Sequence, residues 1–225
     1  MRKRNNYLQR RETSWSFTIT TVSLSRGDAE YYYNMIRYAK PSMIIEIGAG
    51  NTTLLAIQAI EQNKKEQSGY QCELIAVEPY EMPWLEQTGA RILREVVEKT
   101  DRAIFKSLRR NDILFIDSSH MIRPQGDIVF EYLQLLPTLA SGVLIQIHDI
   151  FTPKDYPEVW VVTDVRLWNE QYLLEAFLSF NKEFKIIGAL NYLTHHYPEQ
   201  LTAKCPRLKE ELSNREPGSI WLQKL

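Results

Sequence analysis

Short apolar runs alternate with helix-like segments along the chain after residue 40. The runs are almost continuous in apolar character, which is typical of parallel strands buried on both faces. They are Met43–Ile47, Glu73–Val77, Arg91–Val97, Ile113–Ile116 and Val143–Ile147. The helix-like segments between them are Thr52–Lys65, Glu81–Thr88, Asp101–Leu108 and Asp127–Leu136. This alternation predicts βαβ units, and therefore an α/β fold with a mostly parallel sheet between two layers of helices.

Further elements are expected on both sides of this core. The predicted helices are Gly27–Ala39 and Asp164–Phe180, and the predicted strands are Phe184–Leu190 and Ser219–Leu222. Residues 191–218 are polar and interrupted by prolines. No linker, internal repeat or low-complexity tract divides the sequence. We therefore expect a single domain, residues 28–225, preceded by an N-terminal arm, residues 1–27.

Composition is that of an ordinary globular protein. The 225 residues are 44% hydrophobic and 24% charged, and the formal net charge of −1 gives no reason to expect nucleic acid as a partner. No apolar run is long enough to span a bilayer, and no secretory signal pattern is present. The two cysteines, Cys72 and Cys205, form no metal-binding pair, so we expect a reduced, cytoplasmic protein. A basic cluster is interpreted as part of a solvated arm: Arg2, Lys3, Arg4, Arg10 and Arg11.

Titratable residues stand at the ends of four of the predicted strands. They are Glu46, Glu78, Asp117, His120, His148 and Asp149. Ligands of open α/β sheets bind beyond the carboxyl ends of the strands, so these side chains are expected along one rim. Any one of them could instead terminate a loop or cap a helix. The whole set is better explained by a functional site.

The run Met43-Ile-Ile-Glu-Ile-Gly-Ala-Gly-Asn-Thr-Thr53 has the layout of a nucleotide-type cofactor site, with a strand, a glycine turn and a helix start. A dinucleotide fingerprint requires a third glycine where this chain has Thr53. Glu46 would repel a pyrophosphate, but it suits a ligand that carries an ammonium and a sulfonium. We therefore expect S-adenosylmethionine as the cofactor. Glu78 can accept hydrogen bonds from both ribose hydroxyls of the nucleoside.

These motifs resemble those of class I S-adenosylmethionine-dependent methyltransferases. Ile44-Ile-Glu-Ile-Gly-Ala-Gly is similar to the first motif and Ala76-Val-Glu-Pro to the second. Leu114-Phe-Ile-Asp-Ser-Ser-His120 and Gly142-Val-Leu-Ile-Gln-Ile-His-Asp149 resemble a bacterial subgroup related to macrocin and catechol O-methyltransferases. The resemblance implies a Rossmann-like three-layer sandwich whose seven-stranded sheet ends in an antiparallel hairpin. It also implies these cofactor contacts: Glu46, Ile47, Gly48, Ala49, Gly50, Asn51, Thr52, Glu78 and Asp117.

Methyl transfer to a hydroxyl requires alignment of the acceptor and removal of its proton. In the metal-dependent O-methyltransferases the ligands follow strands four and five, where this chain has Asp117, His148 and Asp149. The resemblance therefore implies a divalent metal, and His148 in place of a carboxylate favours manganese, iron or zinc over magnesium. The alternative is metal-free general base catalysis by His120 or His148. The candidate catalytic residues are His120, His148 and Asp149.

Several alternatives stay open. An NAD-dependent oxidoreductase would use the same kind of glycine turn, and a cofactor-binding partner protein without catalysis would keep the cofactor site alone. The expected partner is a small-molecule or sugar-containing acceptor, with neither nucleic acid nor a membrane. The identity of the acceptor, the role of the basic arm and the oligomeric state, a homo-oligomer included, do not follow from the sequence.

The region after the fifth strand offers further candidates. Four aromatic residues there are expected in the core, with an acceptor-binding wall as the alternative: Trp160, Trp168, Tyr172 and Phe177. The run Phe151-Thr-Pro-Lys-Asp-Tyr-Pro-Glu158 predicts an ordered loop at the mouth of the site and a candidate lid. His195 and His196 are interpreted as surface loop residues, because adjacent side chains do not face the same way.

Overall fold

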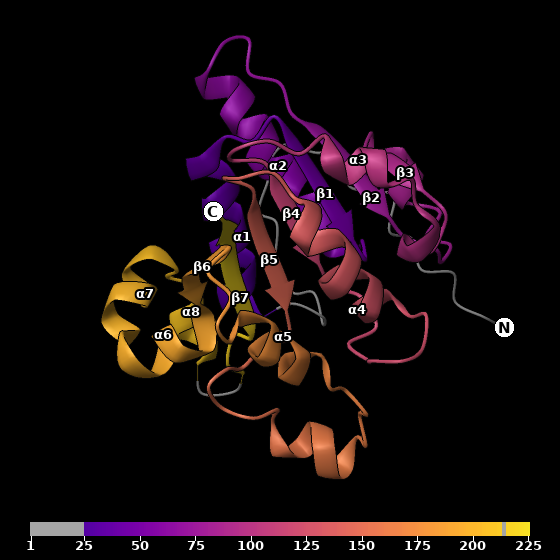
Figure 1. Cartoon of the computed structure of the whole chain (residues 1–225). Helices are drawn as coiled ribbons and strands as arrows, with labels where there is room; N and C mark the ends of the chain where they lie inside the picture. Colours follow the sequence, from indigo (N-terminus) through magenta and orange to yellow (C-terminus); the bar gives the residue numbers. More distant parts are fainter. Residues whose placement is uncertain (1–24, 213–214) are drawn as a thin grey trace, which may run out of the picture.

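Seven strands form a single sheet in the order β3-β2-β1-β4-β5-β7-β6 in the computed structural model (Figure 1), which describes residues 25–212 and 215–225. The strands are β1 (Met43–Ile47), β2 (Glu73–Val77), β3 (Arg91–Leu93), β4 (Ile113–Ile116), β5 (Leu144–His148), β6 (Phe184–Ala189) and β7 (Ser219–Lys224). Strands β1 to β5 pair in parallel, whereas β7 is antiparallel to both β5 and β6. The predicted seven-stranded sheet with an antiparallel C-terminal pair is confirmed.

Helices cover both faces of the sheet (Figure 1). The α-helices are α1 (Arg26–Ala39), α2 (Asn51–Glu66), α3 (Arg102–Lys106), α4 (Asp127–Phe130), α5 (Glu170–Leu178), α6 (Leu190–His196), α7 (Pro198–Lys204) and α8 (Leu208–Glu211). Short 3-10 turns are η1 (Leu85–Thr88), η2 (Val97–Lys99) and η4 (Leu136–Thr138). Two π-helical turns are η3 (Glu131–Leu135) and η5 (Val159–Thr163).

Alternate residues of each strand point to opposite faces, so the sheet has two cores. Ile44 of β1 packs with Tyr32 of α1 and Leu55 of α2 on one face. Its neighbour Ile45 packs in the other core, which includes Ile128 of α4. Complete burial of such a side chain stabilises the fold by roughly 1.5–3 kcal/mol relative to leaving it exposed. The two cores fix the strands, and with them the positions of the residues at their carboxyl ends.

Several predicted elements were too long. The strand predicted over Arg91–Val97 ends at Leu93, and the helix predicted over Glu81–Thr88 is only the 3-10 turn η1. The helix predicted over Asp127–Leu136 changes from α to π geometry and then to a 3-10 turn that contains Pro137. Proline lacks the N–H that a continuing helix would use.

The helix predicted over Asp164–Phe180 was wrong in its first part, because α5 begins at Glu170. Its first N–H groups, those of Asn169 and Glu170, donate to the carbonyl oxygen of His120 at 3.0 and 3.2 Å. Apolar spacing in the sequence gave no sign of this partner from another part of the chain.

The polar segment 191–218 contains three short helices, α6 to α8. Pro198 is the first residue of α7, a position where its missing N–H costs nothing. His195 and His196 are therefore the last residues of α6 and not loop residues, although both are exposed as predicted.

The basic cluster and most of the predicted arm lie outside the described residues. The predicted boundary between residues 27 and 28 falls inside α1, whose buried residues include Gly27 and Asp28. The division into an arm and one domain therefore stays a prediction. Within residues 25–212 and 215–225, none of the helices combines the length and the apolar character that a membrane crossing requires.

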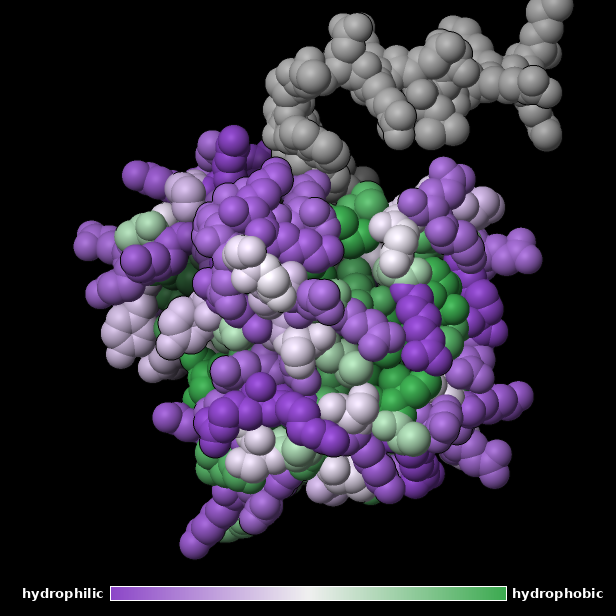
Figure 2. All heavy atoms as spheres, turned by 90° about the horizontal axis from the view of Figure 1, so that it is seen from above, coloured by the Kyte–Doolittle hydropathy of each residue, from purple (hydrophilic) through white to green (hydrophobic). Residues whose placement is uncertain are grey.

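The face over the amino ends of the parallel strands is mostly hydrophilic. Figure 2 shows this face from above, with hydrophilic side chains projecting around its edge and hydrophobic ones visible mainly between them. The titratable residues predicted to form a site lie at the opposite ends of the strands, where β1 and β5 point in Figure 1.

Candidate active site

β1 ends in a glycine turn that leads into α2. Gly48 has a φ of +78°, and a Cβ there would lie 1.9 Å from the carbonyl oxygen of Asp117, so only glycine fits. The Gly48 N–H donates to the carbonyl of Val77 at 3.0 Å, and the Asp117 N–H donates to that of Ile47 at 2.8 Å. A Cβ at Gly50 would meet nothing within 4 Å. The space in front of the turn, at the N-terminus of α2, can therefore admit a ligand.

Glu46 lies beneath this turn and is fully buried. The Tyr32 hydroxyl donates to its Oε1 at 3.0 Å, and the Thr53 hydroxyl donates to its Oε2. Burial raises the pKa of Glu46 to about 7 despite these hydrogen bonds. The carboxyl group thus joins α1, β1 and α2 from inside the fold. Its contact with a cofactor ammonium stays a prediction.

Glu78, at the end of β2, joins the second strand to the glycine turn. It accepts from the N–H of Ala49 at 3.1 Å and from the N–H of Tyr80 at 2.9 Å, one bond to each oxygen. A carboxylate has about four acceptor positions, so lone pairs remain for hydroxyl groups of a ligand. Asn51 and Thr52 form the first turn of α2 on the other side. The structure therefore brings together the residues that the sequence predicted around a nucleoside.

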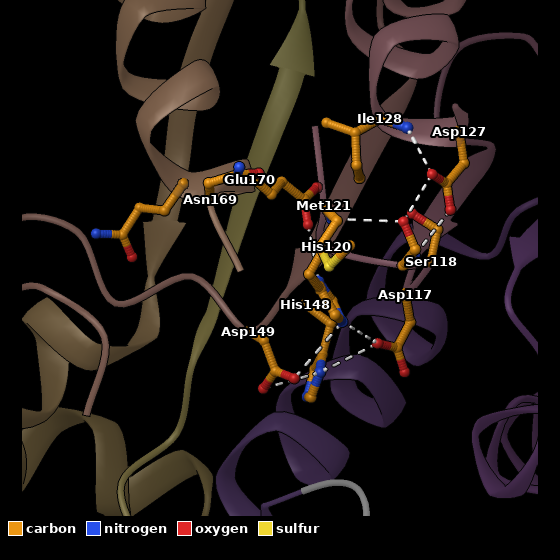
Figure 3. A network of polar contacts seen from close by, with 12 residues as sticks. Asp117, Ser118, His120, Met121, Asp127, Ile128, His148, Asp149, Asn169 and Glu170 are labelled. Atoms are coloured by element: carbon orange, nitrogen blue, oxygen red, sulfur yellow. Dashed lines mark hydrogen bonds and ion pairs between the residues drawn. The ribbon is translucent and has the colours of Figure 1, made fainter. Parts of the chain in front are cut away.

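Figure 3 shows a second group of predicted residues at the carboxyl ends of β4 and β5. Ligand atoms of Asp117, His120 and Asp149 all lie within 4.8 Å of one another. His120 Nε2 is 3.2 Å from Asp117 Oδ1 and 3.7 Å from Asp149 Oδ2. His148 Nδ1 is 3.5 Å and 3.3 Å from Oδ1 of the same two carboxylates. We call these four residues the acid–histidine cluster. It contains the predicted set Asp117, His148 and Asp149, with His120 added.

His148 also faces a residue that the sequence analysis missed. Its Nε2 is 3.7 Å from Oδ2 of Asp28, a buried residue in the first turn of α1. Neither ring nitrogen has a hydrogen bond of normal geometry to any described residue. Burial opposes the charged imidazolium, but Asp149 and Asp117 outweigh it and raise the pKa of His148 well above its ordinary value. Burial likewise opposes the Asp117 carboxylate, yet His148 and His120 hold its pKa below the ordinary value.

His120 is held from behind by a second missed residue. Its Nδ1 lies 2.8 Å from Oε2 of the fully buried Glu170, and the Tyr132 hydroxyl donates to Oε1 of the same carboxylate at 2.8 Å. Burial disfavours the imidazolium, but hydrogen bonds to Asp117 and Glu170 raise the pKa of His120 to about 10. A histidine that is protonated at neutral pH is a poor general base there.

Two cluster residues have an unusual backbone conformation. His120 has a φ of 57° and Asp149 a φ of 55°, both in the left-handed region. This conformation costs a residue with a Cβ roughly 1–2 kcal/mol, and such strain is concentrated at functional sites. It aims both side chains at the same point beyond the sheet.

A cavity of about 1100 Å³ opens beside the acid–histidine cluster. Aromatic side chains form one of its walls, and they are Phe151, Tyr156, Trp160 and Trp168. The Arg166 guanidinium lies 4.2 Å and 4.6 Å from the ring centroids of Trp160 and Trp168. The ring of Trp168 is 4.3 Å from that of His120, so the aromatic wall adjoins the cluster directly.

The four aromatic residues discussed in the sequence analysis have different surroundings. Trp160 and Trp168 line the cavity. Phe177 packs against the core, with its ring 5.8 Å from Tyr132, and Tyr172 is half exposed. Most of the predicted lid, Phe151 and residues 154–157, also borders the cavity. The interpretation as core was therefore correct for Phe177 and wrong for the two tryptophans.

Comparison with known proteins agrees with this architecture. Residues 45–150 match a family model described as a methyltransferase domain, whereas no curated protein matches the sequence. An O-methyltransferase from Bacillus cereus, solved with SAH, is similar with a TM-score of 0.55 and 10% identity over 90% of this chain and 82% of that one. TomG from Streptomyces achromogenes, an O-methyltransferase of tomaymycin synthesis solved with SAM, is similar with a TM-score of 0.50. Its sequence identity is 11%, and the match covers 87% of this chain and 78% of that one.

At such low identities the structural likeness shows the fold alone, and the family match covers residues 45–150. The order of strands, the antiparallel C-terminal pair and the glycine turn after β1 lie where the motifs placed them. Together these findings show that the chain has the class I methyltransferase fold and that its residues 45–150 match a methyltransferase domain.

Proposed function

We propose that the protein is an S-adenosylmethionine-dependent O-methyltransferase that acts on a small-molecule or sugar-containing acceptor. One observation carries the proposal: the open glycine turn and the acid–histidine cluster share a residue. The Asp117 carbonyl touches Gly48 so closely that a Cβ would overlap it, while the Asp117 carboxylate belongs to the cluster. A methyl donor at the turn and an acceptor in the cavity would thus lie on opposite sides of Asp117.

The turn fits the proposed cofactor. S-adenosylmethionine supplies a methyl group activated by its sulfonium when it is bound. Glu78 would accept from the ribose hydroxyls, as its free lone pairs allow. The remaining contacts are proposed from the turn, the first turn of α2 and the neighbouring strand end: Glu46, Ile47, Gly48, Ala49, Gly50, Asn51, Thr52 and Asp117. The solved O-methyltransferases with bound SAM and SAH support this assignment through the shared fold.

The acid–histidine cluster fits a divalent metal. Two carboxylates face two imidazoles, and His148 has buried nitrogens without hydrogen bonds among the described residues. Asp117 and Asp149 would hold the ion together with His148 or His120. Imidazole donors favour manganese, iron or zinc over magnesium. When bound, such an ion lowers the pKa of an acceptor hydroxyl.

The same geometry weakens the metal-free alternative. In the absence of an ion, carboxylate neighbours raise the pKa values of His120 and His148 and favour the protonated imidazoles, and a bound ion would displace the proton from the nitrogen that it contacts. Asp149 and Asp117 line the cavity in which an acceptor would bind. We also propose a cytoplasmic location, which the free cysteines Cys72 and Cys205 fit. A homo-oligomer stays a prediction for sedimentation analysis.

The cofactor assignment can be tested by calorimetric titration with S-adenosylhomocysteine beside NAD, on the wild type and on Glu78→Ala. We expect binding of S-adenosylhomocysteine alone, weakened about tenfold or more in the variant through lost hydrogen bonds. Binding of NAD instead would restore the oxidoreductase alternative. Tight binding of S-adenosylhomocysteine without turnover of any acceptor would favour a catalytically inactive partner protein.

The need for a metal can be tested once an acceptor is found. Activity should be lost in excess EDTA and restored by manganese. Full activity in excess EDTA would contradict the metal assignment and leave the cofactor assignment intact.

A further inference from the structure

We propose that Glu170 is a positioning residue, which fixes the ring of His120 with Nε2 directed at the carboxylates of Asp117 and Asp149. The inference builds on the proposed function, because that function gives the cluster its purpose. It assigns a role to an acid that belongs to none of the sequence motifs and that lies outside the matched segment 45–150.

The side-chain contacts fix both the position and the rotation of the imidazole. Nδ1–H donates to Glu170 Oε2 at 2.8 Å, and the other oxygen is held by the Tyr132 hydroxyl at 2.8 Å. Because Nδ1 is used, Nε2 is the nitrogen left to face the cluster, 3.2 Å from Asp117. A carboxylate behind an imidazole in this way orients it and makes it a better donor to a metal.

The main chain is held by the same end of α5. The carbonyl oxygen of His120 accepts from the N–H groups of Asn169 and Glu170, and the Asn169 side chain accepts from the N–H of Ile122 at 2.6 Å. These bonds secure the left-handed backbone at residue 120. Figure 3 shows Glu170 above His120 and Asp149 below it. Both the side chain and the main chain of His120 are therefore held by residues at the N-terminus of α5.

A purely structural role would not explain the charge. Glu170 is fully buried, and a second buried acid, Glu131, lies close enough that burial and the Glu170 charge raise the pKa of Glu131 well above its ordinary value. A glutamine would fill the same space at a smaller desolvation cost, but it has only one acceptor oxygen and could not accept from both His120 and Tyr132. The carboxylate accepts both bonds and places a negative charge behind His120.

The test compares Glu170→Gln with the wild type. Manganese affinity, measured by calorimetry or by the EPR signal of the free ion, should fall about 10–100-fold, the usual effect of removing a carboxylate behind a metal-bound histidine. Binding of S-adenosylhomocysteine should not change. Glu199→Gln is the matched control, because Glu199 also lies in the first turn of a helix but is exposed.

A double-mutant cycle with His120→Asn separates positioning from general structural damage. If Glu170 acts through His120, Glu170→Gln should add little to the loss already caused by His120→Asn. Additive losses would overturn the proposal. If Glu170→Gln does not fold, Tyr132→Phe removes one of the two bonds to the carboxylate and should weaken manganese binding to a smaller extent.

An NMR measurement keeps the test independent of the metal. The Nδ1–H proton of His120, assigned by its absence in His120→Asn, should give a downfield signal in the wild type that shifts upfield or disappears in Glu170→Gln. An unchanged signal and unchanged manganese affinity in a folded variant would overturn the role of Glu170. Failure of the wild type to bind both manganese and S-adenosylhomocysteine would instead overturn the proposed function.

Discussion

Gly48 and Gly69 differ in their surroundings but hardly in their backbone, with φ values of +78° and +80°. Alanine at either position should cost roughly 1–2 kcal/mol for the left-handed conformation. Gly48→Ala should cost several kcal/mol more, because its methyl would overlap the Asp117 carbonyl oxygen, whereas at Gly69 nothing lies within 4 Å. Urea unfolding of both variants measures the difference. Equal losses would show that the turn does not depend on this close approach.

The raised pKa of Glu46 predicts how the free energy of unfolding depends on pH. Burial raises its pKa from 4.5 to about 7 in the folded state, so the folded protein binds this proton more tightly than the unfolded chain. The contribution of Glu46 to the free energy of unfolding should therefore fall as pH rises from about 4.5 to about 7, by about 3 kcal/mol in total.

Glu46→Gln removes this titration, so the difference in unfolding free energy between wild type and variant should decrease over that pH range and stay constant above it. Urea unfolding at pH 5, 6, 7 and 8 provides the measurement. A difference that does not vary with pH would contradict the raised pKa.

Single residues also show what the sequence can and cannot predict about a site. Residues at strand ends could be predicted, because parallel strands direct their carboxyl ends to one edge. Asp28 and Glu170 could not. Each is an acid in the first turn of a helix, where acids are common because they complement the helix dipole. Only the tertiary structure places them behind His148 and His120.

The helices and strands differ in how well the local sequence pattern predicts their bounds. Buried strands such as β1, β2 and β4 were predicted to the residue, since apolar runs fully buried on two faces have clear ends. The stretch before α5 was not, because its conformation follows from contacts between Arg166 and two tryptophans and from the His120 carbonyl. Helical spacing of apolar residues is the same whether they face a core or a cavity.

The segment between β5 and α5 is held over the cavity by Gln171, which is 1% exposed. Its side chain accepts from the N–H of Phe151 at 2.7 Å and donates to the carbonyl of Lys154 at 2.8 Å. Gln171→Ala should therefore destabilise this segment by about 1–3 kcal/mol, because the buried N–H of Phe151 and the partly buried carbonyl of Lys154 lose their partner.

Amide hydrogen exchange should rise in residues 151–157 of Gln171→Ala while the strands keep their protection. Gln134→Ala is a suitable control, since the side chain of Gln134 accepts from the exposed Arg102, away from this segment, and its loss should leave the segment unchanged. Equal exchange in the two variants would mean that the aromatic contacts, and not Gln171, hold the segment in place.

At the scale of the molecule, both ends of the described chain meet at the cluster. Asp28 accepts from the Ser219 hydroxyl at 2.6 Å and from the Gly218 N–H at 3.0 Å, so α1 and β7 are tied together beside His148. The motif-bearing core could be predicted from short segments of sequence. The contact between α1 and β7 could not be predicted, because Asp28 and Ser219 are separated by most of the chain and neither belongs to a motif.

The acid–histidine cluster lies at the ends of β4 and β5, and His148 faces Asp28, which ties α1 to β7. An ion bound there should therefore stabilise the whole molecule. Manganese at about 100 times its dissociation constant should raise the free energy of unfolding by about 2.7 kcal/mol and the melting temperature by several degrees. Magnesium should have a smaller effect, since it prefers oxygen ligands. Asp149→Asn should remove most of the manganese shift, because it replaces one of the two carboxylates that both imidazoles face. A thermal melt of the wild type and the variant with each ion provides the measurement, and an equal manganese shift in the two proteins would place the ion somewhere other than the acid–histidine cluster.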